Sequence, residues 1–228
     1  MSEKTDKVYP GGGGLARRIL SELKEHAPFT LVGAVTGVLI MVLMVRLKVP
    51  ESVSGHLFST FHPLHVLLSA LVTAAMYRRH SKGRIWAVVL VGYVGSVGIA
   101  TLSDCLIPYL GEWLMGLPNR GLHLGFIEHW YLVNPLAIAG IVIAMVWPRT
   151  KFPHFGHVLL STWASLFHMM MALGQEFTPV MMGLTAVFLF LAVWLPCCAS
   201  DIIFPLVFAR GADGVQVRQT VKRPDVQK

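Results

Sequence analysis

The sequence predicts an all-α integral membrane protein with six transmembrane helices, arranged as an inverted 3+3 repeat and preceded by an N-terminal amphipathic helix. Three observations lead to this prediction. The chain of 228 residues is 54% hydrophobic and only 14% charged, whereas soluble domains are about a quarter charged. Its apolar runs approach the length of about 20 residues that crosses a bilayer. A polar phrase also occurs twice, once in each half of the chain.

The repeated phrase begins with His-x-x-His and ends in serine. It reads His62-Pro-Leu-His65-Val-Leu-Leu-Ser69 in the first half and His154-Phe-Gly-His157-Val-Leu-Leu-Ser161 in the second. Each copy follows an apolar run introduced by Glu-His and precedes a run that ends in Ser-Asp-x-x-x-Pro. These flanking residues are Glu25, His26, Ser103, Asp104 and Pro108 in the first half, and Glu128, His129, Ser200, Asp201 and Pro205 in the second. The chain therefore contains a duplicated unit of three apolar segments.

The elements follow in order from the N-terminus. Residues 1–14 are polar and glycine-rich, which predicts a flexible cytoplasmic tail, and the pattern of residues 15–26 predicts an amphipathic helix on the membrane surface. Six spans separated by Pro and Gly breakers come next. They are expected at 29–45, 57–77, 85–103, 131–147, 155–173 and 179–199. The resulting units are a first repeat with its amphipathic lead-in at 15–110, an outer connection at 111–127, a second repeat at 128–209 and a basic cytoplasmic tail at 210–228.

Lysine and arginine set the predicted orientation, since cytoplasmic segments are enriched in them. They gather in the N-terminal segment, in 78–84, in 149–151 and in the C-terminal tail, and they are sparse in the alternate connections. Both termini are therefore expected on the cytoplasmic side of a cell inner (plasma) membrane. Because each repeat has an odd number of spans, its two copies cross the membrane in opposite senses. The net charge of +7 belongs to these loops and tails, so it does not indicate a nucleic-acid partner.

This topology gathers the repeated polar residues into two clusters near opposite membrane faces. The outer cluster contains His62, His65, Asp104, Glu128 and His129, and the cytoplasmic cluster contains His154, His157, Asp201, Glu25 and His26. Four serines support them, namely Ser69, Ser103, Ser161 and Ser200. His-x-x-His places both imidazoles on one helix face, and imidazoles with carboxylates in dry surroundings suit a divalent metal ion, with zinc, iron, manganese and copper all left open.

Other interpretations of these residues remain open. Duplication retains residues by descent, so identity between the halves does not prove use. Ser-Asp also caps helix ends, and an isolated histidine such as His168 is more often hydrogen-bonded or solvated than a ligand. The three cysteines form no disulfide framework, and Cys197 and Cys198 are expected to be buried free thiols.

Three functions compete on this basis. The first is transport of a divalent metal or another small ion. The second is a membrane-embedded metal-dependent hydrolase, since the residue set is similar to the Ser, Asp and three-His set of the alkaline ceramidase superfamily, although the closing His-x-x-x-His of that superfamily is absent. The third is a b-type haem protein or an anchoring subunit of a membrane redox complex. Besides the lipid bilayer, the long third connection favours a partner subunit on the outer face.

Overall fold

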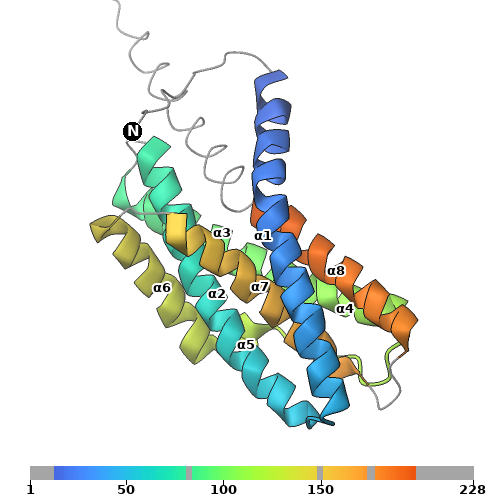
Figure 1. The fold of residues 1–228 in the computed structure, drawn as a ribbon. Helices are drawn as coiled ribbons and strands as arrows, with labels where there is room; N and C mark the ends of the chain where they lie inside the picture. The colour runs from blue at the N-terminus through green and yellow to red at the C-terminus, as the bar shows by residue number, and fades with distance from the viewer. Residues whose placement is uncertain (1–12, 81–83, 148–150, 174–177, 199–228) are drawn as a thin grey trace, which may run out of the picture.

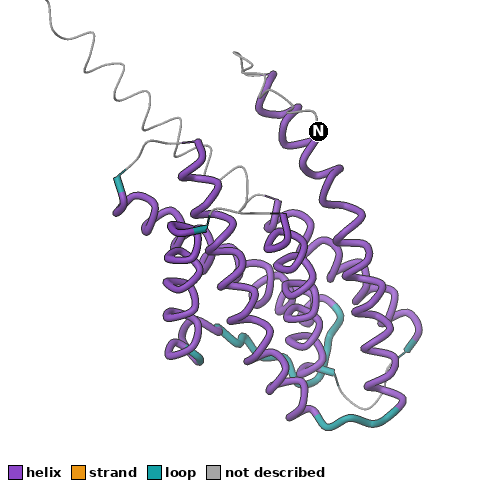
Figure 2. The backbone as a smooth tube through the Cα atoms, turned by 60° about the vertical axis from the view of Figure 1, so that its left-hand side comes forward, coloured by secondary structure: helices purple, strands orange, loops and turns teal. Residues whose placement is uncertain are grey.

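The computed structural model describes residues 13–80, 84–147, 151–173 and 178–198. These residues form helices joined by short segments, and no strand occurs among them, which confirms the predicted all-α class. The helices are α1 (Gly13–Arg46), α2 (Glu51–His80), α3 (Ile85–Thr101), η1 (Leu102–Leu106), α4 (Ile107–Leu114), α5 (Gly125–Glu128), α6 (Trp130–Val146), α7 (Lys151–Ala172) and α8 (Pro179–Cys198). Figure 1 shows the long helices packed side by side, and Figure 2 shows how little of the described chain is loop.

Four segments of the described chain are long and apolar enough to cross a membrane. They are Ala27–Arg46, Glu51–Arg79, Ile85–Leu114 and Pro179–Cys197. α6 is apolar but has only 17 residues, and α7 carries a row of histidines and serines that lowers its hydropathy. The chain is therefore a membrane protein with four candidate spans, and six spans remain a prediction.

The first helix is longer than the sequence predicts. The expected surface helix at 15–26 and the first expected span form one continuous helix, α1, with Pro28 inside it. The expected outer connection at 111–127 contains the end of α4 and most of α5. The expected tail at 210–228 and residues 1–12 of the N-terminal tail lie outside the described residues.

Two helices occupy the centre of the bundle. α2 and α7 pack on each other, and each also packs on two further long helices. α2 packs on α3 and α6, while α7 packs on α8 and α1; α1 also packs on α8, and α3 on α6. In Figure 1, α1 and α6 run in opposite directions, and so do α2 and α7.

The bundle has an apolar exterior and a partly polar interior. Leu31, Val35 and Leu39 project from α1 with 52–63% of their surface exposed, as expected for side chains that contact lipid. The interior contains buried histidine, serine, threonine and carboxylate side chains from α2, η1, α4 and α7. Since polar groups inside a membrane protein need partners, these residues mark where a functional site lies.

Close approach of α6 to α2 depends on Gly140. A β-carbon at this position would overlap the backbone carbonyl of Leu67 and lie 3.0 Å from the β-carbon of Ala70. Backbone atoms of the neighbouring helix cannot move away as a flexible side chain can. Gly140 therefore sets the distance between α6 and α2, the helix that carries His62 and His65.

We expect Gly140→Ala to lower the free energy of unfolding by about 1–3 kcal/mol, the usual cost of overpacking a tight interior. Unfolding in mixed detergent micelles, followed by tryptophan fluorescence, measures this change. Gly98→Ala on α3 is the matched control, because no described atom lies within 4 Å of a β-carbon there. Equal stability of the two variants would contradict the proposed role of Gly140.

Candidate functional site

The buried carboxylate of Asp104 organises a polar cluster inside the bundle. Its Oδ2 lies 2.9 Å from Nδ1 of His62 and 2.7 Å from Nδ1 of His65. Its Oδ1 accepts the hydroxyl hydrogens of Ser103, at 2.6 Å, and Ser161, at 2.8 Å. All five side chains are buried. The carboxylate therefore has four donors from three elements, α2, η1 and α7, and its charge is satisfied within the protein.

Asp104 lies in a π-helical turn within an otherwise α-helical segment. η1 covers Leu102–Leu106 between α3 and α4, and the amide of Ile107 bonds the carbonyl of Leu102, five residues back. Pro108 follows and has no N–H, so it cannot bond a carbonyl in the preceding turn. Single π turns inside α-helices occur frequently at functional sites. Here the wider turn carries Ser103, Asp104 and Cys105 in buried positions.

The carbonyl of Ser103 receives its hydrogen bond from another helix. In the π hydrogen-bond pattern its donor would be the backbone N–H of residue 108, but Pro108 has no N–H. Ser165 on α7 donates its hydroxyl to this carbonyl at 3.0 Å. Because a buried carbonyl without a donor is costly, Ser165 both satisfies the turn and holds α7 against it.

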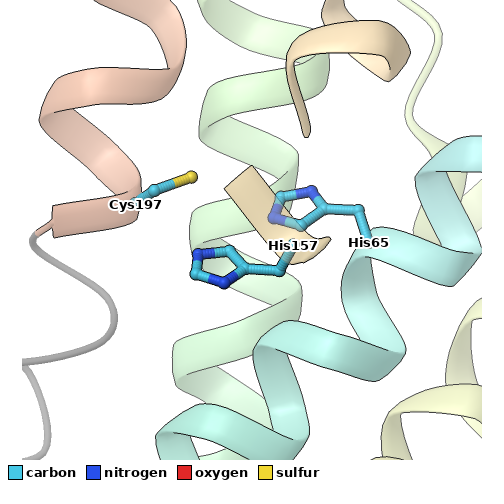
Figure 3. Close-up of side chains that lie close together, drawn as sticks. All are labelled: His65, His157 and Cys197. Atoms are coloured by element: carbon cyan, nitrogen blue, oxygen red, sulfur yellow. The ribbon is translucent and has the colours of Figure 1, made fainter. Parts of the chain in front are cut away.

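Three side chains that could hold a metal ion lie beside this cluster, one on each of three helices. One donor atom each from His65 on α2, His157 on α7 and Cys197 on α8 lie within 4.8 Å of one another, and all three residues are buried. The two imidazole rings are stacked, with centroids 5.8 Å apart and planes 11° apart. Figure 3 shows the sulfur of Cys197 directed toward the two rings. Two imidazole nitrogens and one thiolate form a donor set that suits zinc or copper better than calcium or magnesium.

The hydrogen bond from His65 to Asp104 fixes which ring nitrogen of His65 keeps a lone pair. Since the carboxylate only accepts, Nδ1 of His65 carries the hydrogen and Nε2 retains its lone pair. A ligand histidine whose other nitrogen donates to a carboxylate is the usual arrangement around protein-bound metals, because the carboxylate orients the ring and raises its basicity. Asp104 accordingly acts on His65 as an orienting group in this geometry.

The structure brings together six of the residues singled out from the sequence. They are His62, His65, Ser103, Asp104, His157 and Ser161. The sequence analysis assigned them to two clusters near opposite faces, whereas the structure stacks His65 of the first on His157 of the second. The physical reason is the packing of α2 on α7, which brings the two His-x-x-His phrases into contact.

Three further residues singled out from the sequence lie in the described part of the chain, and none of them belongs to the hydrogen-bond network of Asp104. Ser69 is buried on α2. Glu128 is 41% exposed and pairs with Nδ1 of His123 at 3.3 Å, and His129 joins α5 to α6 with its ring against Tyr131. Ser200 and Asp201 lie outside the described residues, as do the side chains of Glu25, His26 and His154.

Two features of the interior do not follow from the repeat. Cys197 looks like an inert buried thiol in the sequence, because its neighbours are apolar and no partner is adjacent in the chain. Glu112 and His168 form a buried pair, although neither belongs to the duplicated phrase. The signal for Glu112 was its position as a lone carboxylate within an apolar run, since such residues are rarely buried without a role.

Comparison with protein-family models, with curated proteins and with solved structures found no match for this chain.

Ser165→Ala tests the account of the π turn. The substitution leaves the carbonyl of Ser103 buried without a donor, and we expect it to lower the free energy of unfolding by about 1–3 kcal/mol. Ser59→Ala on α2 is the control, because the Ser59 hydroxyl makes only a local, exposed bond to the carbonyl of His56. If both serine variants unfold at the same detergent composition, Ser165 does not stabilise the turn.

Proposed function

We propose that this chain binds a divalent transition metal ion at His65, His157 and Cys197 and moves it across the membrane. The observation that carries the proposal is the meeting of the three donor atoms within 4.8 Å while Asp104 orients His65. Buried imidazoles and a thiol that converge from three helices are costly in a membrane interior unless they bind something.

Zinc is the metal that fits this donor set best, with copper second. Thiolate favours zinc and Cu(I), whereas manganese prefers oxygen ligands and iron prefers imidazole with carboxylate in such sites. We further propose that Asp201, which corresponds to Asp104 in the duplicated sequence, belongs to the same metal-competent set as His157. The same proposal includes His154, the second-half counterpart of His62, and Glu25 and His26, the first-half counterparts of Glu128 and His129.

Transport is supported by the way the helices pack. Exchanging α1, α2 and α3 with α6, α7 and α8 turns each observed packing pair into another observed pair, and the exchanged helices run in opposite directions for the two pairs visible in Figure 1. This pattern supports an inverted repeat of three helices, which we propose spans the inner membrane six times with both termini cytoplasmic. Transporters built from such repeats bind their substrate at the interface between the halves, where His65 meets His157.

One observation favours a metal-dependent hydrolase as a second candidate. Catalytic zinc sites use three protein ligands and leave a fourth position for water, and three donors converge here. The hydroxyl of Ser161 lies 3.7 Å from the sulfur of Cys197, close enough to contact a fourth ligand. A haem is not favoured by the geometry, because the axial ligands of a haem approach iron from opposite sides, whereas His65 and His157 are stacked.

Zinc flux into liposomes tests the transport proposal. We expect the full-length protein, reconstituted with a zinc-sensitive dye inside the vesicles, to admit Zn²⁺ faster than empty vesicles. Loss of one ligand should reduce this rate by about tenfold or more, since one coordination bond contributes more than the 1.4 kcal/mol that a factor of ten represents. The variants are His65→Ala and Cys197→Ala.

The matched control is His56→Ala, which removes an exposed histidine from the same helix as His65. Its flux should equal that of the unmodified protein. Equal flux in His56→Ala and His65→Ala would contradict the transport proposal. Zinc that binds to the unmodified protein without crossing the bilayer would favour the hydrolase instead.

A further inference from the structure

A second buried carboxylate–imidazole pair lies between α4 and α7, apart from the metal-ligating residues. Oε1 of Glu112 is 2.7 Å from Nδ1 of His168, and both residues are 0% exposed. Oε2 of Glu112 accepts a long hydrogen bond of 3.4 Å from the amide of Gly121. Among the described residues no Lys or Arg forms an ion pair with Glu112, so the imidazole of His168 is its main partner. A carboxylate buried in this way needs a function, because it costs stability.

The hydrogen bonds of His168 determine where a further proton can go. Nε2 of His168 accepts the backbone N–H of His123 at 3.4 Å, so its Nδ1 carries the hydrogen and donates it to Glu112. The ring therefore has no free nitrogen lone pair within this network. An additional proton would bind the carboxylate of Glu112, which turns the pair from a carboxylate and imidazole into a carboxylic acid and imidazole.

The pair is connected to the surface on one side. The ring of His123 lies 5.5 Å from that of His168 at a steep angle, and its Nδ1 pairs with Glu128. The side chains of His123 and Glu128 are 39% and 41% exposed. A short row of protonatable groups thus leads from the solvent-exposed segment before α5 to Glu112.

On the other side the pair approaches the Asp104 cluster. The ring of Phe58 stacks on His62 at 5.3 Å and meets His168 edge-on at 5.3 Å. Nε2 of His62 is buried and has no hydrogen-bond partner in the part of the chain that the structure describes, and it abuts Gly125, where a β-carbon would overlap the ring. Gly125 is two residues from His123 in the chain, so the segment that carries His123 also packs on the ring of His62.

Few other charged groups face the pair. On the neighbouring described elements they are His62 on α2, Asp104 on η1, His123 before α5, Glu128 on α5 and the exposed Arg120 next to Gly121. The exposed Arg46 and Glu51 lie at the adjoining ends of α1 and α2. The described part of α8, which also packs on α4, contains no charged residue. Among the described residues, His168 is the titratable group in direct contact with Glu112.

We propose that Glu112 and His168 form a proton-exchange site that connects water at the His123–Glu128 end of the bundle with the buried centre around Asp104. Ionisable residues inside membrane proteins commonly form such relays. Imidazole and thiol ligands lose protons when a metal binds, and the relay gives these protons a route to one side of the membrane. The proton site itself stands on the geometry above, whereas its link to metal binding rests on the proposed function.

Infrared difference spectroscopy after a pH jump tests the proton site without any metal. The full-length protein in lipid nanodiscs is stepped between about pH 8 and about pH 4, an interval that reaches the ordinary pKa range of glutamate as well as that of histidine. We expect a carboxylic-acid band that is absent in Glu112→Gln and shifted in His168→Asn, which removes the hydrogen-bond partner. Glu51→Gln removes an exposed carboxylate near the same end, where Asn119 contacts it, and should retain the band. A spectrum of Glu112→Gln identical to that of the unmodified protein would overturn the proposal.

Proton release on mixing with Zn²⁺ tests the link to the metal centre. With a pH-sensitive dye in weak buffer, we expect Glu112→Gln to slow the appearance of protons by about tenfold or more, the lower range for loss of a positioned proton carrier, with unchanged zinc affinity. Equal rates in Glu112→Gln and Glu51→Gln would overturn the link. Absence of zinc binding by the unmodified protein would instead contradict the proposed function, and the proton site would then be decided by the infrared result alone.

Discussion

The hydrogen bonding of Asp104 is the interaction on which the rest of the interior depends. A carboxylate transferred from water into a bundle of this kind loses several kcal/mol of hydration, and the protein compensates with four donors. Two imidazoles from α2 bind one oxygen, and hydroxyls from η1 and α7 bind the other. These bonds fix the rotation of α2 and α7 about their axes. They thereby hold His65 next to His157. Because α8 packs on α7, Cys197 on α8 also lies next to these two histidines.

The position of Asp104 depends in turn on one backbone irregularity. In an uninterrupted α-helix each residue after Leu102 would be rotated by about 100° from the one before. The π turn adds one residue to a turn without ending the helix, so the side chains in it point in other directions than a regular α-helix would give them. Pro108 lowers the cost of this irregularity, because proline has no backbone N–H that the π turn would leave without an acceptor. Ser165 then supplies the hydrogen that the Ser103 carbonyl lacks. Polar side chains of α7 thus stabilise the backbone of the neighbouring segment as well as the carboxylate.

The sequence was sufficient for the class of fold and for part of the site. Composition alone predicted helices in a membrane, and the duplicated phrase pointed to His62, His65, Asp104, His157 and Ser161. It could not show that both copies of the phrase meet, because this depends on how α2 packs on α7. Cys197 and the Glu112–His168 pair lie outside the phrase, so a search for repeated residues passes over them. The π turn was also hidden, since Ser-Asp-x-x-x-Pro is equally typical of a helix end.

The central claim is that two imidazole nitrogens and one cysteine sulfur bind the same metal ion. X-ray absorption at the zinc edge, on the full-length protein loaded with one equivalent of zinc, measures these bonds directly. The account predicts one sulfur at about 2.3 Å and imidazole nitrogens at about 2.0–2.1 Å from zinc, with the sulfur signal absent in Cys197→Ser. A shell made only of nitrogen and oxygen, unchanged in that variant, would contradict it.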